Sequence, residues 1–183
     1  PRKIAVGPAP EAGKAGKTFF DKGRAMGYRI MPHFNYFSID PNHPAFARLT
    51  DFVAREFGNQ RLKAWRWANG HWTPPPQGFG KLTGLRDEKL MYHLHPGASA
   101  WRRLLAERIA IAVARHKLPA VFVDQTLCTW NIHNALIENL SMVEGMLALT
   151  QELRELDGPL AVGGEGLNEM SVRYQTFAQA HLF

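Results

Sequence analysis

Three short apolar segments of the sequence are typical of buried strands. They span residues 28–35, 120–124 and 160–163. The last two lack polar alternation, which is the pattern of parallel strands covered on both faces. Each segment runs into polar or small residues at its C-terminal end, so we expect polar side chains where the strands stop.

Helical patterns separate these segments, because apolar residues recur there every three or four positions. The helical segments are residues 44–57, 99–116 and 138–156. Ser99 is a good N-cap for the second helix, and the Asp-Gly-Pro at 157–159 ends the third. We expect one more helix from about Asn168 to the C-terminus.

Strands that alternate with helices predict parallel β/α units. A complete (β/α)8 barrel needs about 250 residues and eight strands, so we predict a partial (β/α)8 TIM barrel, as a single domain over residues 1–183. A small doubly wound sheet is the alternative, but no glycine-rich phosphate loop follows any predicted strand. Residues 69–81 contain three consecutive prolines and predict a loop, within an insertion at about 65–81.

Composition and charge exclude several classes of protein. The chain is 45% hydrophobic and 21% charged, as folded domains are, and no apolar run is long enough for a membrane helix. The N-terminal half is basic, but its basic residues are scattered and favour a solvated face over nucleic-acid binding. The single cysteine, Cys128, leaves the localisation unknown. The sequence starts at Pro1 rather than Met, so we expect it to be a piece of a longer chain.

Two carboxylates occupy matching positions at strand ends. Asp124 follows the apolar residues 120–123, and Glu165 follows residues 160–164. Parallel strands bring their carboxyl ends to one face, so both groups can converge on one bond. Glycoside hydrolysis uses such a pair: one carboxylate attacks the sugar or activates water, and the other protonates the leaving oxygen. Helix capping or pairing with an arginine is the alternative for each acid alone. Glu169 is the reserve candidate, although stabilisation of the last helix explains it better.

Histidines form a second group of candidates. His93 and His95 form an H-x-H pair that, with Asp124, could hold a divalent metal. No later histidine stands at the end of a predicted strand, so we expect no metal and no cofactor. We expect His33 and His95 to contact substrate hydroxyl groups instead.

Aromatic and amide residues surround the predicted mouth of the barrel. Flat rings stack on sugar faces, and amides bond hydroxyl groups. Aromatic rings with basic neighbours also suit nucleic-acid stacking, but here the pattern is confined to one loop. We expect the further sugar contacts from Asn35, Trp65, Trp67, Trp72, Gln125, Trp130, Asn131, Asn168 and Glu169.

Met31-Pro-His-Phe-Asn35, Val123-Asp-Gln-Thr126 and Gly163-Gly-Glu-Gly-Leu-Asn-Glu169 resemble a known family. It is a glycoside-hydrolase-like TIM-barrel family, distantly similar to retaining α-glycosidases of the endo-α-N-acetylgalactosaminidase type. The resemblance covers roughly residues 25–183. It implies that the chain holds about strands 3 to 5 of a barrel, with Asp124 as nucleophile and Glu165 as acid/base.

These observations together predict a retaining glycoside hydrolase that acts on an α-linked substrate. Its expected partners are a carbohydrate and the rest of the parent chain, which would complete the barrel; we expect neither nucleic acid nor membrane as a partner. A carbohydrate-binding barrel without catalysis is the first alternative. A metal-dependent hydrolase that uses His93 and His95 is the second.

Overall fold

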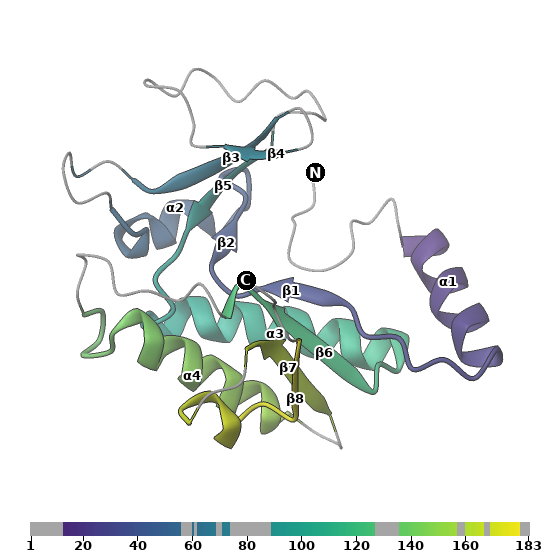
Figure 1. Cartoon of the computed structure of the whole chain (residues 1–183). Coiled ribbons are helices and arrows are strands. Elements are labelled where there is room, and N and C mark those ends of the chain that lie inside the picture. Colours follow the sequence, from purple (N-terminus) through teal and green to yellow (C-terminus); the bar gives the residue numbers. More distant parts are fainter. Residues whose placement is uncertain are drawn as a thin grey trace.

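The computed structural model describes residues 13–55, 60, 62–68, 71–73, 89–126, 136–156, 160–166 and 169–179, and its strands form two four-stranded sheets (Figure 1). The first sheet is parallel, in the order β1-β6-β7-β8. Its strands are β1 (His33–Asn35), β6 (Ala120–Asp124), β7 (Ala161–Glu165) and β8 (Phe177–Gln179). The second sheet is antiparallel, in the order β2-β5-β3-β4. Its strands are β2 (Ser38–Ile39), β3 (Ala64–Ala68), β4 (His71–Thr73) and β5 (Lys89–His93).

Helices α3 (Ser99–His116) and α4 (Met142–Arg154) cover one face of the parallel sheet (Figure 1). Val121, Val123 and Val162 are at most 1% exposed and share one apolar core with both helices. A doubly wound sheet carries helices on both faces, whereas α3 and α4 lie together on one. The arrangement is therefore that of a partial (β/α)8 barrel, as predicted, and β8 adds a parallel strand to the three expected.

The predicted strands agree with the structure to different extents. Residues 120–124 form β6 as predicted, and the segment 160–163 corresponds to β7. Of residues 28–35, only the last three form a strand. Pro32 has no N–H to donate to a ladder, although its carbonyl still accepts from the Phe122 N–H at 3.0 Å.

The long helices begin at positions set by their N-terminal hydrogen bonds. α3 spans the predicted residues, but its N-cap is Ala98; the Ser99 N–H instead donates to Glu138 Oε2 at 3.1 Å, so Ser99 is not the cap. α4 begins at Met142, later than predicted, because Ser141 and Glu144 form a capping box. The predicted stop at 157–159 lies outside the described residues. A further helix, α1 (Gly13–Ala25), precedes β1. Across the described ranges, no helix has the length and apolar character needed to span a membrane.

The antiparallel sheet is inserted between β1 and α3. The helix predicted over 44–57 is wrong: its residues form α2 (Phe46–Leu49) and the 3-10 turn η2 (Thr50–Phe52), and the chain is then extended. Buried Ala54 donates to the His93 carbonyl at 2.8 Å and accepts from the Lys63 N–H at 2.7 Å, so backbone pairing ends the helix. Residues 71–73 of the predicted loop form β4; residues 69–70 and 74–81 lie outside the described residues.

The helix predicted from about Asn168 is also wrong. Within the described residues this region holds a single 3-10 turn, η4 (Ser171–Arg173), followed by strand β8. The Thr176 N–H donates to the Val162 carbonyl at 2.7 Å, and the Gly166 N–H donates to the Gln179 carbonyl at 3.1 Å. Backbone pairing along the exposed edge of β7 therefore overrides the helical spacing of the apolar residues.

Candidate functional site

Two rows of side chains cross the parallel sheet on the face opposite α3 and α4. In the first row, His33 is aligned with Phe122, which is aligned with Gly163, which is aligned with Phe177. Two positions later, Asn35 is aligned with Asp124, and Glu165 with Gln179. Because side chains alternate along a strand, both rows share one face, and the second row is a polar strip at the carboxyl ends of the strands.

Asp124 and Glu165 lie side by side in this polar strip. Val123 on β6 is aligned with Gly164 on β7, and Asp124 and Glu165 are the residues that directly follow them. Neighbouring strands are about 4.7–4.9 Å apart, so the backbone brings both side chains to one face with their Cα atoms at a spacing of that order. The structure thus brings together the two strand ends that the sequence singled out.

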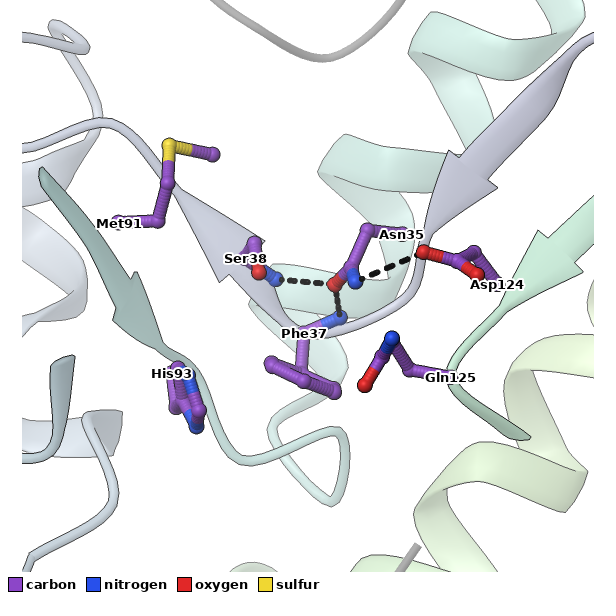
Figure 2. Close-up of a pocket in the computed structure, with 7 residues that line it drawn as sticks. All are labelled: Asn35, Phe37, Ser38, Met91, His93, Asp124 and Gln125. Carbon is purple, nitrogen blue, oxygen red and sulfur yellow. Dashed lines mark hydrogen bonds between the residues drawn. The ribbon is translucent and has the colours of Figure 1, made fainter. Parts of the chain in front are cut away.

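Asp124 lines a pocket of about 260 Å³, whose two walls come from different sheets (Figure 2). The parallel sheet supplies one wall, made of Asn35, Asp124 and Gln125. The other wall consists of Phe37, Ser38, Met91 and His93, from β2, β5 and the link between β1 and β2. Among the described residues that line the pocket, Asp124 is the only acidic one, and His93 is the only one with a basic side chain. The pocket therefore combines a carboxylate with apolar and neutral polar groups, a composition typical of small-molecule sites.

Asn35 joins the two walls of the pocket. Its Nδ2 donates to Asp124 Oδ2 at 3.5 Å, and its Oδ1 accepts from the N–H groups of Phe37 at 3.1 Å and Ser38 at 3.0 Å (Figure 2). The Oδ1 contacts form an Asx-type turn that starts β2. Asn35 was predicted as a sugar ligand; in the structure its amide bonds both the carboxylate and the backbone of the neighbouring wall.

The residues that follow Asp124 adopt a sharp local turn. Gln125 has φ 71°, in the left-handed region that non-glycine residues seldom occupy, and it lines the pocket. Thr126 Oγ1 then bonds the backbone of Glu165 twice, accepting from its N–H at 2.7 Å and donating to its carbonyl at 3.0 Å. Strained backbone of this kind concentrates at functional sites, and the threonine fixes the end of β7 against β6.

Glu165 is partly exposed at the end of β7 and is not part of the pocket lining. It stands on the Asp124 side of the sheet, one strand further from the antiparallel sheet. Asp124 on β6 therefore lies between the pocket and Glu165 on β7. A ligand in the pocket would have to extend past Asp124 to contact Glu165.

The two histidines of the H-x-H pair have different surroundings. His93 lines the pocket and its ring lies 4.4 Å from that of Phe37. Burial, with a smaller contribution from the Lys63 charge, lowers the pKa of His93 to about 3, so its ring is neutral near pH 7. His95 is fully buried and its Nδ1 accepts from the Gly97 N–H at 2.9 Å. It thus supports a turn and does not line the pocket, contrary to the substrate contact expected of it.

No three His, Cys, Asp or Glu side chains come close enough to hold a metal ion in the part of the chain that the structure describes. His93 and Asp124 both line the pocket, but the buried His95 does not join them. The geometry therefore gives no support to the metal-dependent alternative built on this pair.

The remaining predicted contact residues lie elsewhere or outside the description. His33 is exposed and stacks on Phe122 at 4.4 Å, in the first row of the sheet face. Glu169 lines a separate groove between α4 and η4, beside Glu144 and Arg173, and the helix it was expected to stabilise is absent. The backbones of Trp65, Trp67 and Trp72 lie in β3 and β4, with Trp65 opposite Met91 and Trp67 opposite Trp72. Trp130, Asn131 and Asn168 lie outside the described residues.

Sequence reasoning missed half of the antiparallel wall. His93 was singled out, but neither Ser38 nor Met91 was. The only sequence signal near them is the short segment 89–93, whose apolar residues give it no clear strand or helix period. Its role depends on pairing with β2 and β3, which lie far away in the sequence.

No protein-family model and no curated protein matches the sequence. Solved structures do match. The α-N-acetylgalactosaminidase NagBb from Bifidobacterium bifidum, in a GalNAc complex, aligns with TM-score 0.63 and 14% identity over 97% of this chain and 26% of its own. TtGalA, an α-galactosidase from Thermus thermophilus in complex with stachyose, aligns with TM-score 0.54 and 17% identity over 88% of this chain and 30% of its own. Ega3 from Aspergillus fumigatus, in complex with galactosamine, aligns with TM-score 0.53 and 10% identity over 88% of this chain and 54% of its own.

Identities this low show a shared fold and nothing finer. The chain has the fold of glycoside hydrolases of the α-galactosidase and α-N-acetylgalactosaminidase type, as the sequence resemblance implied. It spans less than a third of the length of NagBb and of TtGalA.

Proposed function

We propose that this protein is a retaining glycoside hydrolase that cleaves an α-linked sugar, with Asp124 as nucleophile and Glu165 as acid/base. The observation that carries the proposal is the position of Asp124. It ends a barrel strand, lines a pocket and stands beside a second carboxylate on the next strand. In barrel enzymes, this end of the strands is where the chemistry takes place. The α-linkage rests on the neighbours of the fold, whose names describe α-glycosidases.

The proposed reaction has two steps. Asp124 attacks the anomeric carbon of a sugar held in the pocket, the bond from that carbon to the leaving oxygen breaks, and Glu165 gives its proton to that oxygen. A glycosyl ester on Asp124 results. Glu165 then takes a proton from water, whose oxygen attacks the anomeric carbon, and the Asp124 carboxylate leaves. The sugar is released with its original anomeric configuration.

The strand geometry is compatible with the short carboxyl separation of a retaining enzyme. Retaining enzymes hold their two carboxyl groups about 5–5.5 Å apart, whereas inverting enzymes leave about 6.5–9.5 Å for a water molecule. Asp124 and Glu165 are on one face of adjacent strands directly after an aligned pair, which sets a backbone spacing of about 4.7–4.9 Å. Side chains that leave one face of two strands at this backbone spacing can bring their carboxyl groups to the retaining distance.

The pocket lining supports a sugar as ligand. Phe37 and Met91 supply apolar surface, and Ser38, His93 and Gln125 supply neutral groups that bond hydroxyls. His93 stays neutral well below pH 7, so its ring adds no charge to the pocket over the working range of most enzymes. We further propose that the tryptophans of β3 and β4 extend this surface, and that strands from the rest of the parent chain complete the barrel.

The test uses the natural full-length protein with aryl α- and β-glycosides as substrates. We expect turnover of an α-glycoside, with Asp124→Asn reducing it to background and Glu165→Gln reducing it by about 10²–10⁴-fold. Glu107→Gln, which makes the same chemical change on the exposed side of α3, is the matched control and should leave turnover unchanged. NMR of the first product should show the α-anomer. Full activity of Asp124→Asn, or a β-anomer as first product, would contradict the mechanism.

A carbohydrate-binding barrel without catalysis is the second candidate function. The observation that favours it is the absence of Glu165 from the lining of the pocket that contains Asp124. If the folded wild-type protein binds a sugar and Asp124→Asn weakens that binding, while no glycoside in the panel is cleaved, this second function replaces the first.

A further inference from the structure

The amide of Asn35 lies where the two sheets of the molecule meet. The chain leaves the parallel sheet at Asn35 and enters the antiparallel sheet at Ser38, with only Tyr36 and Phe37 between them. Both of these aromatic residues are buried, and the indole N–H of Trp101 on α3 donates to the Tyr36 carbonyl at 2.8 Å. The junction is therefore fixed by two sets of hydrogen bonds. Trp101 of the helix layer bonds it on one side, and the Asn35 side chain bonds it on the pocket side.

An amide performs both functions of this side chain with two different atoms. The Oδ1 accepts from two backbone N–H groups, which a carboxylate would do equally well. The Nδ2 donates to the Asp124 carboxylate, which an ionised carboxylate could not do because it has no proton to donate. Asn35 thus meets a requirement that an ionised aspartate does not satisfy.

We propose that Asn35 is a positioning residue that ties the orientation of Asp124 to the position of the antiparallel wall. This inference rests on the proposed function, in which Asp124 is the nucleophile. The contact of 3.5 Å is long for a hydrogen bond, so its contribution is orientation rather than strong binding energy. A displacement of about 1 Å at a reacting group costs about 10²-fold in rate, so a small loss of orientation is measurable.

The deciding variant is Asn35→Asp, because it separates the two functions of the amide. The new carboxylate keeps the acceptor for Phe37 and Ser38 but places a second negative charge beside Asp124. Two carboxylates this close do not both ionise easily, so the pair holds a proton to higher pH. We expect kcat to fall by about 10–100-fold with little change in KM, and the acidic limb of the pH–rate profile to move to higher pH.

A direct sugar ligand would behave differently, and the same kinetics separate the two roles. If Asn35 bound the sugar in the ground state and did nothing else, Asn35→Ala, which adds no charge beside Asp124, would raise KM and leave kcat unchanged. That result would overturn the positioning role.

Thermal unfolding tests the contact independently of any activity. Protonation favours the folded state of the Asn35→Asp variant, so its stability relative to wild type is best at low pH and is lost as pH rises through the titration of the pair. The Tm of Asn35→Asp relative to wild type should therefore be lower at pH 8 than at pH 4. This loss should be about 3–5 °C for each unit by which the pKa of the carboxylate pair is raised.

The double variant Asn35→Asp with Asp124→Asn is the matched control. It restores one amide and one carboxylate with their positions exchanged, so the extra pH dependence should disappear. A Tm difference for Asn35→Asp that stays constant from pH 4 to pH 8, or one that persists in the double variant, would overturn the inference. Because the unfolding result needs no turnover, an inactive wild-type protein would refute the proposed function while leaving this test decisive for the contact.

Discussion

Gly163 on β7 is a position at which the parallel sheet leaves no room for an added methyl group. An ideal Cβ there would lie 2.2 Å from Cε2 and 2.3 Å from Cζ of Phe177, the residue aligned with it on β8. Unstrained carbon atoms stay about 3.5–4.0 Å apart. In Gly163→Ala the Phe177 ring would therefore have to retreat by more than about 1 Å, or β8 would have to move away from β7.

The cost of this clash outweighs the ordinary benefit of replacing glycine in a strand. Overpacking of this kind costs about 1–3 kcal/mol, and removing glycine from a strand interior returns about 0.5–1 kcal/mol. We expect Gly163→Ala to destabilise the protein by about 1–2 kcal/mol, which lowers Tm by about 2–8 °C for a chain of this size. Gly16→Ala is the control: a Cβ at Gly16 of α1 meets nothing within 4 Å, so that change should stabilise the helix.

The assay is a double-mutant cycle followed by urea unfolding. Phe177→Ala removes the ring and its packing, and in that background Gly163→Ala should cost nothing or add stability. A coupling energy of about 1 kcal/mol or more between the two sites would confirm the contact. If Gly163→Ala costs the same with and without the Phe177 ring, the proposed packing of β8 on β7 is refuted.

Two further predictions concern buried polar groups. The pKa of His93 is lowered to about 3 by burial and by Lys63, so the unfolded chain binds a proton that the folded chain excludes, and stability falls as pH drops below about 6.5. His93→Gln should therefore lose about 2 kcal/mol less than wild type between pH 7 and pH 5 in urea unfolding, and an equal loss would contradict this role. Gln175 is 5% exposed, and both polar atoms of its amide lack a hydrogen-bond partner within the described residues. Gln175→Met should therefore raise the free energy of unfolding by about 1–2 kcal/mol in the same urea assay. A loss of stability would instead reveal a partner for the amide.

The features that could be predicted from the sequence depend on short-range patterns. The apolar run 120–124 and the helical spacing of 99–116 both form the expected elements, because each buries a face or stripe that is written into consecutive residues. Asp124 could be found for the same reason, since a polar residue that ends an apolar strand is placed at the sheet edge by the strand itself.

The features that the sequence did not reveal depend on distant backbone pairing. The helix predicted over 44–57 has good spacing, yet it ends early because Ala54 pairs with His93 and Lys63, which are far along the chain. β8 replaces a predicted helix because the edge of β7 takes its backbone bonds, and Gly163 leaves room for the Phe177 ring. Spacing within one segment contains no information about such partners.

The site shows the same division. Asn35, Asp124 and Gln125 lie at the end of parallel strands and were predicted, whereas Ser38 and Met91 belong to a wall that exists only through the antiparallel pairing of β2 with β5 and of β5 with β3. The burial of His95 was equally hidden. His95 follows β5 directly, and its Nδ1 accepts a hydrogen bond from the Gly97 N–H in a turn. The H-x-H pattern in the sequence does not predict this turn.

The antiparallel sheet is anchored to the barrel layer at both of its ends, which favours a fixed wall over a movable lid. At its entry, Asn35 bonds the first residues of the insertion and Asp124. At its exit, buried Arg102 on α3 donates to the carbonyls of Pro96 at 2.9 Å and Gly97 at 2.7 Å, and its Nε donates to Glu152 on α4 at 2.7 Å. Movable lids have few such bonds at their hinges. The geometry of the pocket is therefore set when the chain folds. Under the proposed function, the shape and polarity of β2 and β5 would select the ligand, and the proposed bond-breaking groups lie on β6 and β7.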